Sequence, residues 1–191
     1  MMKYSNKEIF TFSNFLSFVR LLLAVPLWIL LDNFQSESTR YLILTVCLLA
    51  ALTDIFDGYF ARKNNQITEV GKIIDPLADK IGIGAVIIKL FLIGQIPLYY
   101  FLMIIGRDFL IFLGGIIVTQ KLNRVLPSNI LGKSAVIVIG IVIILILLNV
   151  NKNGLLFISF YYLSIFLIFT SLIGYIIRAK EFIKKKNHGT I

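Results

Sequence analysis

Cysteine and histidine are almost absent from the sequence, which contains one of each among 191 residues. Cys47 lies in an apolar stretch and has no second cysteine, so neither a disulfide framework nor a thiolate zinc site can form within the chain. His188 lies in the charged C-terminal tail, which disfavours a histidine metal cluster or a histidine base. We interpret Cys47 as a lipid-facing packing residue and His188 as a solvated tail residue.

Charged residues are also scarce: they make up 15% of the chain, against 58% apolar residues, and the mean hydropathy is +0.90. A soluble domain of this length has too little interior to bury so much apolar surface, so lipid must cover the remainder. The first apolar run follows a polar, mixed-charge segment and lacks a small-residue cleavage site, so we expect a retained helix. The composition predicts a polytopic membrane protein.

Six apolar stretches approach the length of about 20 residues that a helix needs to cross the bilayer core. They cover residues 14–31, 41–61, 73–93, 98–119, 130–149 and 155–177. We predict an all-α integral membrane protein whose single domain, 1–191, contains a juxtamembrane segment (1–12), a six-helix bundle (13–178) and a basic cytoplasmic tail (179–191). Residues 4–12 mix charges with large apolar side chains, so this segment is either a short amphipathic surface helix or a frayed terminus.

The basic residues predict the orientation, because loops rich in Lys and Arg stay in the cytoplasm. Six spans with both termini inside place thirteen of the 19 basic residues on the cytoplasmic side, namely Lys3, Lys7, Arg62, Lys63, Lys72, Lys121, Arg124, Lys133, Arg178, Lys180, Lys184, Lys185 and Lys186. Only Arg40 and Lys152 fall in the outside segments. The net charge of +9 therefore indicates a membrane surface as the partner, and no nucleic acid.

Five of the ten acidic residues lie inside the predicted helices, where an aspartate costs about 2.5–3.5 kcal/mol to insert at the centre. Asp54 and Asp57 are three residues apart near the end of the second helix. Asp75 and Asp79 are four apart at the start of the third, so each pair projects from one helix face. A short loop joins the two helices as an antiparallel hairpin. We therefore expect the four carboxylates to meet at its cytoplasmic end.

Four carboxylates at close range need a compensating positive charge. A divalent cation provides it, and all-oxygen ligation favours magnesium, manganese or calcium over zinc or copper. Gly58, Ala61 and Gly71 keep the neighbouring helix surfaces small, which leaves room for a bulky ligand. Arg62 adds a planar fork suited to phosphate oxygens. The pattern predicts a pyrophosphate held by metal ions at the membrane surface.

The same residues carry a family resemblance. The spacing Asp54-x2-Asp57-Gly58-x2-Ala61-Arg62-x8-Gly71-x3-Asp75-x3-Asp79 is similar to the full motif of the CDP-alcohol phosphatidyltransferase family, with all eight fixed positions present. Residues 14–20 and Pro26 also resemble the first helix of the phosphatidylglycerophosphate synthase branch, with Ser17 where threonine is usual. The resemblance implies six spans, a cytosolic active site and a homodimer, and by analogy the inner membrane of a bacterium.

The resemblance also implies roles for individual residues. The donor would be CDP-diacylglycerol and CMP the leaving group, with Mg²⁺ or Mn²⁺, expected as two ions, held by Asp54, Asp57, Asp75 and Asp79. Asp79 would in addition accept the proton of the acceptor hydroxyl. Residues assigned to the CDP-lipid are Asp57, Gly58, Ala61, Arg62 and Gly71.

The acceptor is predicted from basic residues in or near the fourth and fifth helices. A basic pocket formed by Arg107, Lys121, Arg124 and Lys133 would suit a phosphorylated acceptor such as glycerol 3-phosphate. The alternative for Lys121 and Arg124 is that they only enforce the topology. Asp108 is either a site residue or a salt-bridge partner of its neighbours.

Several alternatives stay open. Gly106-Arg107-Asp108, followed by Pro127-Ser128 and Gly132-Lys133, looks similar to cardiolipin synthases of the eukaryotic type, whose acceptor is phosphatidylglycerol. Serine and inositol-phosphate acceptors also remain possible. In a different class, a cation or proton transporter would place its carboxylates near the midplane within repeated, broken helices, and no repeat is visible here. A structural lipid-binding protein, or an ion-pair network with Arg20, Lys80 or Arg107, would leave the full acidic motif unexplained.

Overall fold

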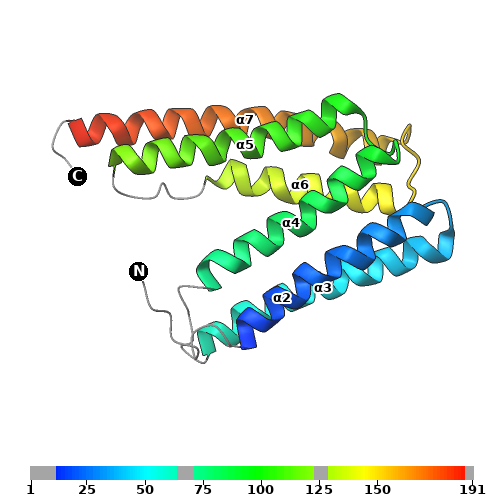
Figure 1. Ribbon diagram of the computed structural model, residues 1–191. Helices are drawn as coiled ribbons and strands as arrows, with labels where there is room; N and C mark the ends of the chain where they lie inside the picture. The colour runs from blue at the N-terminus through cyan, green and yellow to red at the C-terminus, as the bar shows by residue number, and fades with distance from the viewer. Residues whose placement is uncertain (1–11, 64–70, 123–128, 188–191) are drawn as a thin grey trace. The chain divides into compact units, whose positions relative to one another are not determined.

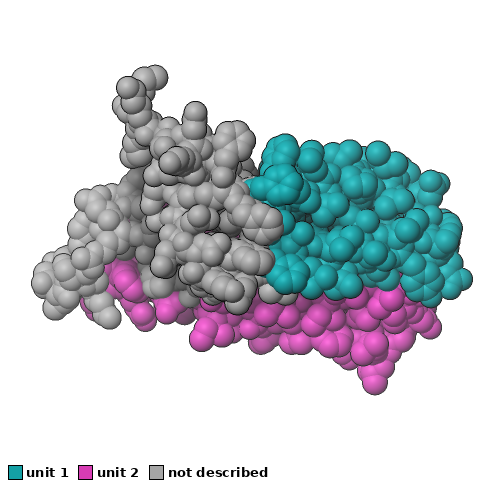
Figure 2. Space-filling model, turned by 90° about the horizontal axis from the view of Figure 1, so that it is seen from below, with its two compact units in different colours: residues 1–95 teal, residues 96–191 magenta. Residues whose placement is uncertain are grey.

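The computed structural model describes residues 12–63, 71–122 and 129–187, and the long elements of this part are all α-helices. It describes the backbone but not the side chains of residues 12–14, 54–55, 57–63, 71–79, 119–122, 183 and 185–187. The chain divides into two compact units, residues 1–95 and 96–191, which are coloured separately in Figure 2. Each unit has its own buried apolar core. That the whole chain forms one six-helix domain stays a prediction.

Four helical segments of the described part are long and apolar enough to cross a membrane. They are Phe15–Asn33, Leu98–Val118, Ile130–Leu147 and Leu155–Phe182. At this level the prediction of an all-α membrane protein is confirmed. The two helices that carry the acidic motif are also long, with 27 and 22 residues, and their crossing of the membrane remains a prediction.

The first unit contains α2 (Phe12–Leu30), the short 3-10 helix η1 (Leu31–Asn33), α3 (Glu37–Lys63) and α4 (Gly71–Leu92). α2 packs against both α3 and α4, and Figure 1 shows α2 and α4 running in the same direction. One face of α2 is buried at Ser17, Arg20 and Leu27. The opposite face exposes large apolar side chains at Phe15, Phe18, Leu22, Val25 and Ile29. This division is that of a helix with one face in a protein core and the other in lipid.

The second unit contains α5 (Leu98–Leu122), α6 (Ile130–Leu147) and α7 (Leu155–Asn187), and α7 packs against both of the others. Hydroxyl groups join two of these helices, because Tyr100 Oη and Ser164 Oγ are 2.7 Å apart in the buried interface between α5 and α7. The Asn129 side chain caps α6 by accepting a hydrogen bond of 3.2 Å from the Leu131 backbone N–H.

Two helices end in left-handed residues that reverse the chain. Gly94 has a φ of 71°, and Asn149, at the end of α6, has a φ of 53°. In both cases the next residue donates its backbone N–H to the carbonyl five positions earlier, at 2.8 Å for Gln95 and 3.0 Å for Val150. The breaks predicted at 94–97 and 150–154 are confirmed, and a known helix-ending geometry explains them.

Two predicted helix boundaries were wrong, one at the start of α3 and one at the end of α7. The break expected at 32–40 is shorter, because η1 and a tight turn reverse the chain and α3 already begins at Glu37. The last helix, expected to end at residue 177, continues to Asn187. Apolarity ends where lipid ends, whereas a helix continues through good helix formers such as the Lys, Arg and Glu residues of this segment.

Candidate active site on α3 and α4

The acidic motif lies on two consecutive helices of the first unit, α3 and α4, which both pack against α2. Asp54 and Asp57 belong to the C-terminal part of α3, and Asp75 and Asp79 belong to the first turns of α4. Gly58, Ala61 and Arg62 also lie on α3, and Gly71 is the first residue of α4. Their side chains lie outside the described residues, so the meeting of the four carboxylates stays a prediction.

The helical backbone supports the spacing argument for a metal site. Residues three or four positions apart on an α-helix lie on one face, and both aspartate pairs have such spacing within α3 and α4. Their side chains offer only carboxylate oxygens, which are the ligands that Mg²⁺ and Mn²⁺ prefer. The donor set therefore fits a divalent metal site of all-oxygen ligation.

Arg107, predicted to bind the acceptor, is a buried junction of the second unit. It is 6% exposed and its guanidinium contacts all three helices. Nη2 donates to the backbone carbonyl of Gly132 on α6 at 2.9 Å, and Nε donates to Ser171 Oγ on α7 at 3.3 Å. Nη1 donates to Asp108 Oδ1 at 2.6 Å, so of the two alternatives left open for Asp108 the structure shows the salt bridge. Arg107 thus has a packing role that its sequence position did not reveal.

The other three bases of the predicted acceptor pocket are less constrained. Lys133 lies in the first turns of α6 and is exposed. Lys121 belongs to the end of α5, but its side chain lies outside the described residues, and so does Arg124. The structure therefore brings Arg107 close to the start of α6 and leaves the pocket as a whole a prediction.

The sequence analysis did not identify Ser171, although the spacing of two serines in an apolar segment carried a signal. Ser164 and Ser171 are buried in the largely apolar first part of α7, where they are seven residues apart and so share one face. Small hydroxyl residues in a membrane helix commonly mark a helix–helix contact. This spacing was sufficient to predict that this face of α7 contacts another helix, and the structure shows that the helix is α5.

Lys89 and Asp32 form a second ion pair that the sequence argument missed. Lys89 Nζ on α4 lies 2.5 Å from Asp32 Oδ1 on η1, and 4.9 Å from the centroid of the Trp28 ring. The Lys89 side chain is 9% exposed and that of Asp32 is 61% exposed. The ion pair joins the C-terminal end of α4 to η1, which follows α2. It lies at the opposite end of the unit from the acidic motif.

Comparison with known proteins decides the family. The sequence model of the family described as CDP-alcohol phosphatidyltransferase matches residues 10–176. This chain belongs to that family. The matched range includes the whole acidic motif and most of both units, so the family covers nearly the whole chain.

Relatives of this family member come from several bacteria. A protein of Rickettsia bellii named CDP-diacylglycerol–glycerol-3-phosphate 3-phosphatidyltransferase is 41% identical over 98 residues, which is 51% of this chain and 54% of the relative. A protein of Aquifex aeolicus with the same name is 32% identical over 182 residues, covering 91% of this chain and 98% of the relative. A Bacillus subtilis relative of that name is 40% identical over 86 residues, or 45% of this chain and 44% of its own length. The chain spans about half the length of the first relatives, and nearly all of the Aquifex protein.

Proposed function

We propose that this phosphatidyltransferase family member transfers the phosphatidyl group of CDP-diacylglycerol to glycerol 3-phosphate and releases CMP. The observation that carries the proposal is the complete acidic motif on α3 and α4. Family membership and the name of the nearly full-length Aquifex relative support the donor and the acceptor. A cation transporter is disfavoured, because its function would not require this motif or this family.

The proposed step is a substitution at phosphorus. The acceptor hydroxyl oxygen forms a bond to the phosphorus that carries diacylglycerol, the bond from that phosphorus to the CMP oxygen breaks, and CMP leaves with the electron pair. Asp79 accepts the hydroxyl proton as the new bond forms. Two bound Mg²⁺ or Mn²⁺ ions would neutralise the phosphate charge and stabilise the attacking and leaving oxygens. Asp54, Asp57, Asp75 and Asp79 would hold these ions.

The neighbouring residues bind the two substrates in this proposal. Gly58, Ala61 and Gly71 leave space for the cytidine and the pyrophosphate, and Arg62 contacts phosphate. Arg107 and Lys133, with Lys121 and Arg124, bind the phosphate of the acceptor. For Arg107, which lies on α5, the support is that its Nη2 lies 2.9 Å from the Gly132 carbonyl, one residue before Lys133 on α6.

We further propose six spans with both termini in the cytoplasm, an active site at the cytoplasmic face of a bacterial inner membrane, and a homodimer. The uneven distribution of Lys and Arg supports the orientation. Because Cys47 is the only cysteine, a Cys47→Ser protein is free of thiols and accepts single probes. New cysteines at Ser36 and Lys152 should react with an impermeant thiol reagent from outside, and a cysteine at Lys180 should not.

The deciding experiment is CMP release by the purified protein, given CDP-diacylglycerol and Mg²⁺ or Mn²⁺, with separate candidate acceptors. Release that requires glycerol 3-phosphate would support the proposal. Release only with phosphatidylglycerol would replace it with cardiolipin synthesis, the alternative that the Gly106-Arg107-Asp108 sequence suggested. No release with any acceptor, from well-folded protein, would contradict the transferase activity.

A further inference from the structure

Arg20 is a buried positive charge on α2, the helix that packs against both helices of the acidic motif. It lies on α2 and is only 6% exposed. A guanidinium remains protonated at physiological pH, and a buried charge is stable only when opposite charges or hydrogen bonds compensate it. Two observations indicate which acidic residues lie near Arg20: its level along α2, and its place on the buried face of that helix.

The contact between Lys89 and Asp32 defines the level of Arg20. Lys89 Nζ lies 2.5 Å from Asp32 and 4.9 Å from the Trp28 ring centroid. Arg20 precedes Asp32 by twelve residues and Trp28 by eight. Because α2 and α4 run in the same direction with a rise of about 1.5 Å per residue, the same steps back from Lys89 reach positions 77 and 81. Arg20 is therefore level with the part of α4 that contains Asp79.

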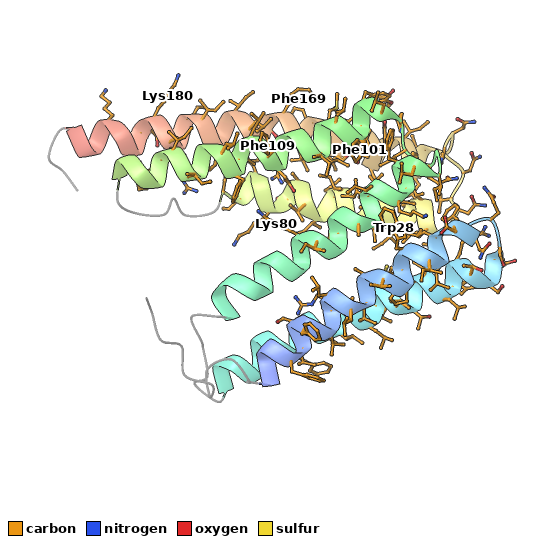
Figure 3. All side chains as sticks on the ribbon, in the orientation of Figure 1. Trp28, Lys80, Phe101, Phe109, Phe169 and Lys180 are labelled. Carbon is orange, nitrogen blue, oxygen red and sulfur yellow. The ribbon has the colours of Figure 1, made fainter. Side chains whose placement is uncertain are left out.

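The buried face of α2 directs Arg20 into the unit. Ser17, Leu27 and Leu31 are buried on the same face, and α2 packs against both α3 and α4. Lys80, at the same level of α4, is exposed, and Figure 3 shows its side chain on the side of α4 away from α2. Of the described basic residues at this level, Arg20 is thus the one within the packed interior.

The acids available to Arg20 follow by elimination. Among the acidic residues of α3, α4 and η1, Asp32 pairs with Lys89 and Glu37 accepts a hydrogen bond of 3.3 Å from Tyr41. Both lie at the far end of the unit from Arg20. The acids that remain on these elements are the four of the motif, Asp54, Asp57, Asp75 and Asp79.

We propose that Arg20 is a fixed counter-charge of the aspartate motif, which it partly neutralises from α2. The inference rests on the proposed function, because it takes the four aspartates as the metal site. Arg20 and the metal ions then compete to neutralise the same carboxylates, so each weakens the effect of the other. Arg20 would stabilise the metal-free protein, and it would limit the affinity for metal so that the site is not occupied irreversibly.

The test measures metal binding and stability, independently of turnover. Mn²⁺ binding is followed by electron paramagnetic resonance at pH 8, and thermal unfolding is recorded with EDTA and with saturating Mn²⁺. In Arg20→Met we expect the Kd for Mn²⁺ to fall by about tenfold, because a like charge near a divalent ion has been removed. We also expect the melting temperature to fall more in EDTA than in Mn²⁺.

Two variants serve as matched controls. Arg20→Lys keeps the charge and should bind Mn²⁺ with nearly the wild-type Kd. Leu27→Ala removes packing from the same face of α2, where Leu27 is 5% exposed. It should lower the melting temperature equally with and without Mn²⁺ and leave the Kd unchanged, as a purely structural change does.

Other outcomes would contradict either the role of Arg20 as a counter-charge or the proposed function. If Arg20→Met behaves as Leu27→Ala does, or binds Mn²⁺ more weakly than the wild type, Arg20 is not a counter-charge of the motif. If Arg20→Met does not fold, Arg20→Gln is measured by the same criteria, and a Kd equal to that of the wild type overturns the inference. If wild-type protein binds no Mn²⁺, the metal site fails and the proposed function with it.

Discussion

Arg107 on α5 and Gly132 on α6 are joined by a hydrogen bond of 2.9 Å from the guanidinium Nη2 to the backbone carbonyl. A Cβ atom added to Gly132 would lie 3.3 Å from the same Nη2. The missing side chain of Gly132 therefore allows the close approach of Arg107. The same guanidinium also reaches Ser171 on α7, so one buried arginine joins the three helices of its unit. A substrate role and a packing role for Arg107 must be separated by experiment.

Replacing Arg107 with alanine should affect both roles. We expect the KM for the acceptor to rise more than the KM for CDP-diacylglycerol, because a phosphate contact is lost. We also expect the protein to lose about 2–3 kcal/mol of stability, since Asp108 and Ser171 lose a charged hydrogen-bond partner. Steady-state kinetics with each substrate varied, and thermal unfolding, measure the two effects.

Ser171→Ala is the matched control for Arg107→Ala. It removes the hydrogen bond of 3.3 Å that Ser171 Oγ accepts from Arg107 Nε, together with the local bond of 2.8 Å that Ser171 Oγ donates to the Ile168 carbonyl. It should cost about 0.5–1.5 kcal/mol of stability without changing the acceptor KM. An increase of the donor KM alone in Arg107→Ala would exclude Arg107 from the acceptor pocket.

Gly132→Ala tests the close approach itself. Alanine should displace Arg107 by a few tenths of an ångström, because the new Cβ would be only 3.3 Å from Nη2. Gly140→Ala, on the same helix, is the control, because a Cβ at Gly140 meets nothing within 4 Å. Gly140→Ala should be neutral or more stable by up to about 1 kcal/mol. Gly132→Ala should be less stable than Gly140→Ala by about 1–2 kcal/mol, and equal melting temperatures would contradict the contact.

Asp79→Asn should reduce CMP release at least about 100-fold, because asparagine cannot accept the hydroxyl proton. The variant should remain inserted and monodisperse in detergent, as measured by size-exclusion chromatography. Glu181→Gln, which removes an exposed carboxylate from α7, should retain wild-type activity. Substantial turnover by Asp79→Asn would remove the assignment of Asp79 as the base.

The Lys89–Asp32 pair predicts an asymmetric double-mutant cycle. Asp32→Asn leaves the buried ammonium of Lys89 without its partner and should cost about 1–2 kcal/mol, a value reduced by the exposure of Asp32. Lys89→Met leaves only the hydrated Asp32 carboxylate and should cost less than about 1 kcal/mol. The double variant should lose less stability than the sum of the losses in the two single variants. Additive losses in thermal unfolding would show that the two charges are not coupled.

Much of the fold could be predicted because it follows from local chemistry. Apolar runs marked the six long helices of the described residues to within a few residues at most ends, since apolar side chains gather where a helix packs in a core or faces lipid. Gly94 ended α4 where expected, because glycine adopts a positive φ without strain. The extension of α7 to Asn187 was missed, because hydropathy reports where lipid ends and not where the helix ends.

The sequence by itself determined the family and the chemistry of the candidate site, because eight residues at defined spacing match the family motif, and four of them are aspartates that form an all-oxygen donor set on two consecutive helices. Only the tertiary structure decided which distant residues meet. Lys89 with Asp32, and Arg107 with Gly132 and Ser171, are separated by 25 to 64 residues in the chain. Such contacts depend on how the helices pack and on which faces they turn toward one another. The spacing of residues in a sequence shows which residues share a face of one helix, but not which helix that face meets.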